Sequence, residues 1–350
     1  MTDRAAALQQ GSKRIPFVDI AKAIAIFLVL MGHTVDSDTM SKTVIYSFHM
    51  PLFFMLSGFV MKSRASYTKE TWKTFLGKRV WTMLFTYLLW GLIYAKFSFK
   101  HLLYILWGTR NTLIYAESLT SLWFLPVLFL ASVMAEAVNA AASRIKCNRA
   151  LVLSLFAVGM LCIGLILPTN EKYGYPFGAD IAFTAAGFML IGELAAMLFQ
   201  MPFTQKPLLS AVCFLVSAGC FIAYFLLVPQ DGYVLMANSI YGNPFLFVFI
   251  SLIGSVMVIS FSMLLQCVKQ DQKLLPYIGR NTLGIFILHK PVVELLRKVV
   301  TKLHFDYNHP VCLFVIPVVT LCVVLPVLYV IQRYAPFLFG KTDFERKKEV

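Results

Sequence analysis

Residues 14–35 read RIPFVDIAKAIAIFLVLMGHTV, an apolar stretch that carries ionisable side chains at Asp19, Lys22 and His33. The step from Lys22 to His33 turns an α-helix through about 1100°, which is three full turns plus roughly 20°. These two side chains therefore share one face, and Asp19 lies on nearly the same side. Ionisable groups inside a membrane helix are costly to bury and usually line a polar pathway. The stretch predicts a transmembrane helix with a functional polar stripe.

The composition extends this interpretation to the whole chain. Of its 350 residues 59% are hydrophobic and only 14% are charged, and apolar runs long enough to cross a bilayer recur along it. We therefore expect an all-α integral membrane protein with about ten transmembrane helices. No cleavable signal peptide is evident, so we expect the first span to be retained. The expected spans are residues 15–35, 44–62, 79–97, 121–139, 150–168, 179–200, 208–228, 245–267, 278–297 and 311–334.

The distribution of Lys and Arg predicts the orientation. With the N-terminus inside, the inner segments carry 21 of the 31 cations, the outer segments carry 8, and Lys22 and Lys290 lie within spans. This asymmetry favours cytoplasmic termini in a cell (inner) membrane. We expect a cytoplasmic segment over 1–14, the ten-span domain over 15–334 and a basic cytoplasmic tail over 335–350. The net charge of +14 we attribute to loops that face anionic lipid, not to nucleic-acid binding.

The same orientation gives the depth of the polar residues. At 1.5 Å per residue Lys22 lies about 10 Å from the inner side and His33 about 27 Å from it, near the outer face. The second span runs back inward, which places His49 beside His33. A neutral imidazole suits proton abstraction from a hydroxyl, although a single interfacial histidine can also simply cap a helix end. Asp19 and Lys22 fit either a buried ion pair or the cationic wall of a cavity.

Further polar residues mark other spans. The cationic segment from Lys62 to Arg79 suits either a phosphate-rich cofactor or lipid headgroups. In the expected ninth span Arg280 and Asn281 lie at the inner end, whereas His289 and Lys290 lie mid-span and need a polar cavity.

Small residues and aromatic residues complete the pattern. Ser57 and Gly58 predict a close helix approach, and Trp123 at the outer start of the fourth span is typical of an aromatic belt. The seven cysteines show no metal-ligand spacing, and we expect no metal site.

Taken together, five stretches resemble the membrane-bound acyltransferase family 3, and most closely its fucose 4-O-acetylase-like branch of surface-polysaccharide O-acetyltransferases. Two departures are that the first-span basic residue is more often Arg than Lys, and that Thr86 and Tyr87 stand where a proline is common. The resemblance covers the chain in order and is carried by Asp19, Lys22 and His33, by Pro51–Gly58 preceded by His49, by Arg79, by Leu122–Pro126 and by Ile278–His289.

The resemblance implies transfer of an acetyl group from cytosolic acetyl-CoA, with no permanently bound cofactor, to a hydroxyl of a cell-surface or lipid-linked sugar. His33 would be the general base, assisted by His49, while Asp19 and Lys22 would form the inner wall of the cavity. Arg79, Arg64 and Arg280 would hold the CoA phosphates, and Trp123, His289 and Asn281 would contact the sugar. Two alternatives stay open: another acyl group such as succinyl, and a transporter of lipid-linked sugar that uses the intramembrane charges as a substrate path. The oligomeric state is not readable from the sequence.

Overall fold

The computed structural model describes residues 15–61, 64, 66–116, 118–168, 170, 172–201, 206–229, 234–268 and 273–340. These residues form helices and no β-strand, apart from one isolated bridge between Leu235 and Ile240. Seven helices in this part of the chain are long and apolar enough to cross a membrane, and the chain is a multi-pass membrane protein. They are α2 (Pro16–Thr34), α9 (Phe124–Ala142, continued from η4, Ser118–Trp123), α10 (Arg149–Ile166), α11 (Ala179–Phe199, preceded by η5, Pro176–Gly178), α12 (Pro207–Leu227), α13 (Pro244–Val268) and α16 (Pro310–Tyr334).

The three other expected spans are also helical, but each is built from pieces, so the count of ten spans and the orientation stay predictions. The backbone leaves the helical region at Phe48 (φ −145°), directly before His49, and again at Asn281 (φ −103°, ψ 12°). The pieces are α3 (Met40–Tyr46) and α4 (His49–Phe59); α5 (Lys69–Arg79), the π-helical turn η1 (Val80–Phe85) and α6 (Thr86–Tyr94); and α14 (Leu274–Arg280) and α15 (Thr282–Lys302).

Much of the segment expected as the cationic loop after the second span is helix α5. Thr68 caps its start, since its hydroxyl accepts a hydrogen bond from the Thr71 amide at 3.3 Å. The sequence pattern concealed this helix because its side chains are mostly polar and show no apolar stripe of helical period.

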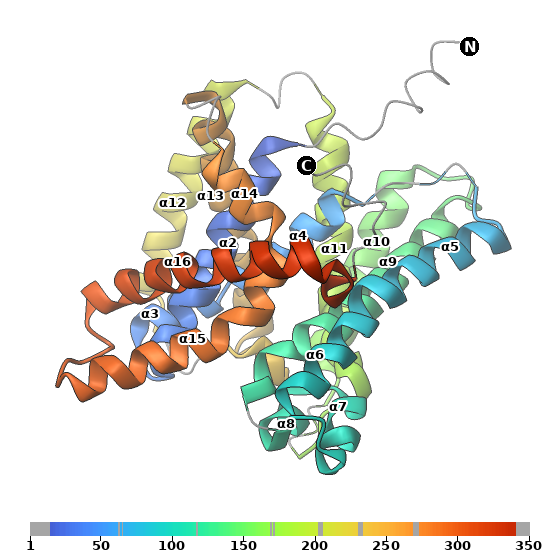
Figure 1. Cartoon of the computed structure of the whole chain (residues 1–350). Coiled ribbons are helices and arrows are strands. Elements are labelled where there is room, and N and C mark those ends of the chain that lie inside the picture. Colours follow the sequence, from blue (N-terminus) through green and yellow to red (C-terminus); the bar gives the residue numbers. More distant parts are fainter. Residues whose placement is uncertain are drawn as a thin grey trace.

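Helix α2 is the hub of the fold. It packs against α3, α4, α13, α14, α15 and α16, and Figure 1 shows α12 and α13 upright beside it while α15 and α16 run across them. Its first turn is in backbone contact with α14, because a Cβ at Gly279 would overlap the carbonyl of Asp19. The polar stripe of α2 is therefore enclosed by the late helices of the chain.

Helices α4 and α11 approach each other at reciprocal glycines. A Cβ at Gly58 would overlap the Met189 carbonyl, and one at Gly192 would overlap the Met55 carbonyl. This confirms the close helix approach predicted at Gly58.

The connecting segments hold short helices. Helix α7 leaves Leu103 and Trp107 exposed. The first residues of the expected tail 335–350 pack against α6, because Trp90 Nε1 donates to the Leu338 carbonyl at 2.8 Å; residues 1–14 and 341–350 lie outside the described part. The short helices are η2 (Phe99–His101), α7 (Leu102–Trp107), α8 (Arg110–Leu113), η3 (Ile114–Ala116), η7 (Met236–Asn238) and η8 (Pro336–Phe339).

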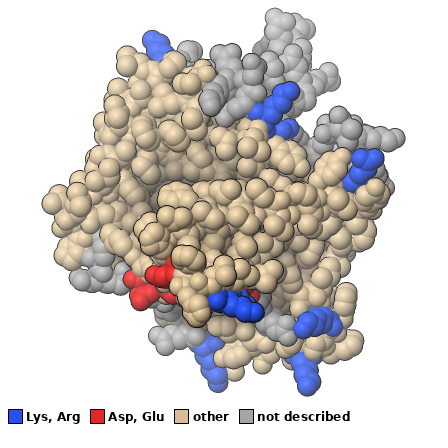
Figure 2. Space-filling view, turned by 60° about the vertical axis from the view of Figure 1, so that its left-hand side comes forward, with Lys and Arg blue, Asp and Glu red and all other residues tan. Residues whose placement is uncertain are grey.

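The surface agrees with a membrane-embedded body. In Figure 2 charged side chains gather toward the upper and lower margins of the face shown, and a broad uncharged band lies between them. Along α12 and α16 the exposed side chains include Leu208, Leu215, Val318 and Tyr329, which suit contact with lipid tails.

Candidate active site

A cavity of about 160 Å³ lies at the end of α2 that carries His33. Its volume would hold several water molecules or part of a sugar ring. The lining comes from elements far apart in the chain, which only the tertiary fold brings together. We call it the histidine cavity; its polar and aromatic lining is His33 and Ser37 from α2 and the residues after it, Lys42 and Tyr46 from α3, His49 from α4, Arg110 from α8, Thr120, Ser121 and Trp123 from η4, and Phe286 from α15.

His33 and His49 therefore face one space, as the predicted hairpin requires. His49 Nδ1 lies 2.8 Å from the Ile45 carbonyl oxygen, and because a carbonyl only accepts, Nδ1 carries the proton. Nε2 of the neutral His49 ring is then an acceptor. No hydrogen bond holds the His33 ring within the described residues, so its nitrogens are free to act on a bound group.

His289 lies behind His33 and not in the cavity wall. Its side chain is 0% exposed, and its ring centroid is 5.0 Å from that of His33. Nδ1 donates to the Phe286 carbonyl at 2.7 Å, whereas the buried Nε2 has no hydrogen-bond partner among the described residues. A buried acceptor without a donor is costly, so this nitrogen is placed to take a hydrogen bond from a neighbouring group.

Three cations surround the same space. Lys42 and Arg110 line it, and Lys290 donates to the hydroxyl of Thr120, which also lines it. Arg110 Nη1 donates to Asn238 Oδ1 at 2.8 Å, and Asn238 in turn donates to Asn111. Within the described residues no carboxylate lines the cavity.

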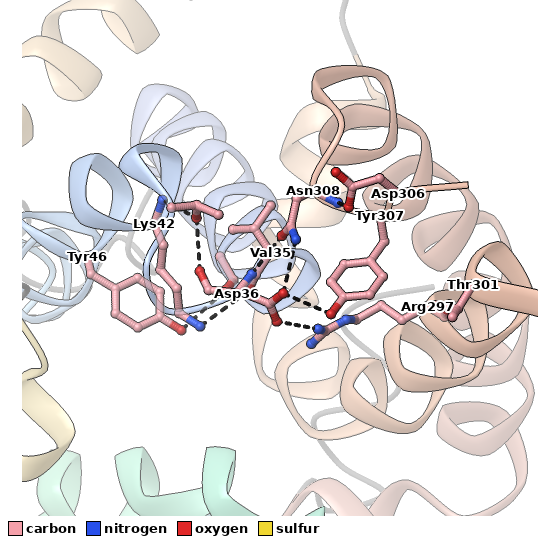
Figure 3. Close-up of polar contacts among 11 residues, drawn as sticks. Val35, Asp36, Lys42, Tyr46, Arg297, Thr301, Asp306, Tyr307 and Asn308 are labelled. Carbon is pink, nitrogen blue, oxygen red and sulfur yellow. Dashed lines mark hydrogen bonds and ion pairs between the residues drawn. The ribbon is translucent and has the colours of Figure 1, made fainter. Parts of the chain in front are cut away.

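An aspartate clasp fixes the end of α2 next to the cavity (Figure 3). Asp36 accepts hydrogen bonds from Arg297 at 2.7 Å, from Tyr307 at 2.8 Å and from the Asn308 amide at 3.0 Å. The Arg297 guanidinium also lies over the Tyr307 ring, 4.1 Å from its centroid. The hydrogen bond from Asn308, followed by those from Tyr307 and Arg297, lowers the pKa of Asp36 below its ordinary 3.8. The clasp joins the segment directly after α2 to α15, through Arg297, and to the connection between α15 and α16, through Tyr307 and Asn308.

In Figure 3 Lys42 lies on one side of Asp36, and Arg297 and Tyr307 lie on the other. Its ammonium donates to the Val35 carbonyl at 3.3 Å and lies 5.2 Å from the centroid of the Tyr46 ring. Burial lowers the pKa of Lys42, and repulsion from Arg297 and Arg110 adds to this while Asp36 opposes it. The protein environment thus disfavours the charged form of this lysine.

A second polar region lies at the other end of α9. Arg64 pairs with Glu136, which is 2% exposed, and Arg149 pairs with Glu193 at 2.7 Å. The Asn139 amide donates to Glu193 at 2.7 Å and its oxygen accepts from Arg149. We call these five residues the paired-charge layer. Since Asn139 lies about 24 Å along α9 from Trp123 at 1.5 Å per residue, the layer is well separated from the histidine cavity.

The remaining predicted site residues lie outside the histidine cavity. Asp19 and Lys22 belong to the continuous helix α2, as expected, but toward its other end. Arg280 is exposed, and its Nε donates to the Pro276 carbonyl at 3.0 Å. Asn281 donates to the Tyr277 carbonyl at 2.9 Å and accepts from Gln332 at 3.0 Å, so it bridges α14 and α16.

The predicted cofactor cations Arg64 and Arg79 lie together. Their guanidinium carbons are 5.4 Å and 5.5 Å from the centroid of the Phe75 ring. The structure therefore gathers two of the three residues expected to meet CoA phosphates, and separates Asn281 from the residues that line the cavity. Within the described residues no group of three or more His, Cys, Asp and Glu side chains could hold a metal ion.

Sequence reasoning missed Arg110, the Asp36 clasp and most of the paired-charge layer. A signal for Arg110 and Lys42 was present, because cations in expected outer loops run against the positive-inside trend. Glu136 was also recognisable as a carboxylate within an apolar span. The partners could not be found this way, since each lies on another element.

Comparison with known proteins gives the family. Residues 15–329 match the family model described as "Acyltransferase domain". Over 221 residues the chain is 25% identical to "Nodulation protein NolL" of Sinorhizobium fredii (strain NBRC 101917 / NGR234), which covers 58% of this chain and 56% of that protein, so the match spans little more than half of the relative's length. No solved structure matches the chain. Because the family model covers most of the chain and the body is a bundle of apolar helices, the protein belongs to the membrane acyltransferases defined by this domain.

Proposed function

We propose that this acyltransferase moves an acetyl group from cytosolic acetyl-CoA to a hydroxyl of a cell-surface or lipid-linked sugar, in the cell membrane, with His33 as the general base. The observation that supports this best is the histidine cavity. His33 and His49 face one cavity, and the ring of His33 has no hydrogen bond within the described residues. A sugar hydroxyl bound there would meet a free imidazole nitrogen, which is the geometry that general-base catalysis needs.

The reaction conserves atoms and charge without a further reactant. His33 takes the proton of the acceptor hydroxyl while its oxygen attacks the thioester carbonyl carbon. The carbon–sulfur bond of the tetrahedral intermediate then breaks, an ester forms, and His33 returns the proton to the departing CoA sulfur. Ser121 lines the cavity, and its hydroxyl group is the donor we assign to the oxyanion.

The proposed roles of two other histidines follow from their hydrogen bonds. Because Nδ1 of His49 donates to Ile45, its neutral ring offers an acceptor and not an oxyanion donor. We assign His49 to orienting the acceptor hydroxyl. We assign His289 to positioning His33: its partnerless Nε2 would accept one His33 N–H and leave the other His33 nitrogen as the base.

Donor binding is assigned to the opposite end of the molecule. Arg79 and Arg64 flank the Phe75 ring in a cationic segment. Arg64 uses its Nε for Glu136, so we propose its terminal guanidinium nitrogens, together with Arg79, for the CoA phosphates. Lys22 and Asp19 would line the way of the pantetheine arm along α2. The succinyl alternative remains a variant of the same reaction.

The test is sugar O-acetylation by cells that carry His33→Ala at matched expression. We expect a loss of about 10²–10⁴-fold, the range that a general base contributes, and a smaller loss for His49→Ala. His304→Ala, which changes an exposed histidine outside the cavity, should retain activity. Unchanged acetylation in His33→Ala would end the assignment, and a larger loss in His49→Ala would transfer the role of base to His49.

A further inference from the structure

The charge of the histidine cavity indicates the charge of the group that it binds. Lys42 and Arg110 line it, whereas Lys290, which contacts its Thr120 wall, pairs with Glu294 at 3.8 Å; no carboxylate lines the cavity within the described residues. Two other half-buried cations of this chain have a carboxylate partner, since Arg64 pairs with Glu136 and Arg149 pairs with Glu193. Lysine and arginine groups removed from water are costly unless a negative charge meets them.

The hydrogen bonds show that Arg110 is held in place and not simply exposed to water. Asn238 accepts from its Nη1 at 2.8 Å, and Asn111 accepts from Asn238. A guanidinium has five N–H donors, so most of its donor capacity remains for a bound group. A planar fork fixed in this way suits bidentate binding of a carboxylate or phosphate.

Lys42, on helix α3, is the second cation that lines the histidine cavity. Its ammonium has a backbone acceptor in Val35 and the face of Tyr46, but no ion pair with a carboxylate within the described residues. The oxyanion of the tetrahedral intermediate is a single short-lived charge to which the Ser121 hydroxyl is already assigned, so the two cations remain for another group. Lys42 and Arg110 are half-buried cations of the resting protein, and an anion already present on a bound reactant would meet both of them.

We propose that the histidine cavity recognises a permanent negative charge, a carboxylate or a phosphate, held between Lys42 and Arg110 on one of the two groups that react there. This inference rests on the proposed acyl transfer and narrows its substrate class. The charge has two possible sources: an acidic or phosphorylated acceptor sugar, or a dicarboxylic acyl group such as succinyl. Both present the same oxyanion chemistry to Lys42 and Arg110.

The experiment identifies the ester that the enzyme makes. Surface glycans and lipid-linked sugars are extracted from the source organism with the wild-type protein and with His33→Ala, and His33-dependent esters are identified by mass spectrometry. We expect each such ester to carry a carboxylate or phosphate on the acylated residue, on its immediate neighbour or on the acyl chain, and the location identifies the source. A neutral acyl group on a neutral sugar region would overturn the inference but uphold the acyl transfer, whereas the absence of any His33-dependent ester would overturn the transfer itself.

A second measurement assigns the charge recognition to the two residues. Purified Lys42→Gln and Arg110→Gln are assayed for CoA release with the donor and acceptor so identified. We expect the KM of the charged reactant to rise about ten- to a hundredfold, the usual loss for a charge-assisted contact, with a smaller change in kcat. Lys302→Gln, an exposed cation outside the cavity, serves as the matched control and should leave both parameters unchanged. A fall in kcat alone would assign the two cations to the oxyanion and overturn the inference.

Discussion

The histidine cavity and the paired-charge layer lie at opposite ends of α9 and use the same residue types differently. In the layer each cation meets a carboxylate: Arg64 meets Glu136, and Arg149 meets Glu193 with Asn139 between them. In the cavity Lys42 and Arg110 meet amides, backbone carbonyls and an aromatic face. The difference indicates that the layer holds helices α9, α10 and α11 together, whereas the cavity keeps its charges for a bound group. Variants of the paired-charge layer should therefore lower the free energy of unfolding, whereas variants of the cavity cations should leave it unchanged or raise it.

The largest effect on stability is expected in the paired-charge layer. Arg149→Met leaves the Glu193 carboxylate buried without its cation, and we expect the free energy of unfolding to fall by about 2–3 kcal/mol. This is less than for a fully buried pair because the Arg149 side chain is 28% exposed. The measurement is thermal unfolding of the purified protein in detergent micelles, with the exposed Arg144→Met as control.

The double variant sharpens this comparison. Removing both charges, with Arg149→Met and Glu193→Leu, should recover much of the loss, because no unpaired charge then remains. Additive losses in the double variant would show that the pair is not coupled, and the distinction between the two regions would fail.

The Asp36 clasp is a further place where a cation is paired with a carboxylate. It lies next to the histidine cavity, yet Arg297 has its carboxylate there. Asp36→Asn should lower the free energy of unfolding by about 1 kcal/mol, a modest loss because the Asp36 side chain is 41% exposed. Asp38→Asn, two residues away and exposed, is the matched control and should change little.

The pH dependence of the clasp has a definite sign. The pKa of Asp36 is lowered in the folded protein, so its contribution is complete above the ordinary value of 3.8 and is lost only as the pH falls below it. The difference in unfolding temperature between wild type and Asp36→Asn should therefore be constant from pH 8 to pH 5. A difference that shrinks within this range would show that another group controls the clasp.

The smallest effect is expected in the cavity, and its direction is opposite. Lys42→Met removes an ammonium whose charged form is disfavoured by burial and by Arg297 and Arg110. We expect the free energy of unfolding to stay constant or to rise by about 0.5 kcal/mol, as when a charge kept for function is removed. Lys302→Met is the control. A marked loss of stability in Lys42→Met alone would mean that this lysine supports the fold, as the paired-charge layer does.

Local sequence patterns were sufficient to predict where the long helices lie. Apolar runs predicted each of the seven long spans to within a few residues, and Gly58 predicted a close helix approach, for which the structure supplies α11 as the partner. They failed where a helix is interrupted. The breaks at Phe48 and Asn281 lie within apolar or mixed sequence that carries no proline or glycine at the break itself.

The residues of the site also divide into those that local sequence patterns predicted and those that only the fold placed there. His33 was identified from a helix of known period, and His49 from the hairpin that follows it. His289 was expected at mid-membrane as a substrate contact, but the fold places it directly behind His33 with its side chain fully buried. Arg110 and the Asn238 that holds it come from separate connecting segments, whose paths no periodicity describes.

The sequence by itself determined the membrane helices, the polar stripe of α2 and the family, because burial of apolar side chains in lipid and a 3.6-residue period are local properties of the chain. Only the tertiary structure decided which charges are paired. Ion pairs and shared cavities depend on how helices cross and where their connections return, so residues at any separation can meet. His33 was recognisable as a polar residue in an apolar helix, but its setting between His289 and a cationic cavity is a property of the folded bundle.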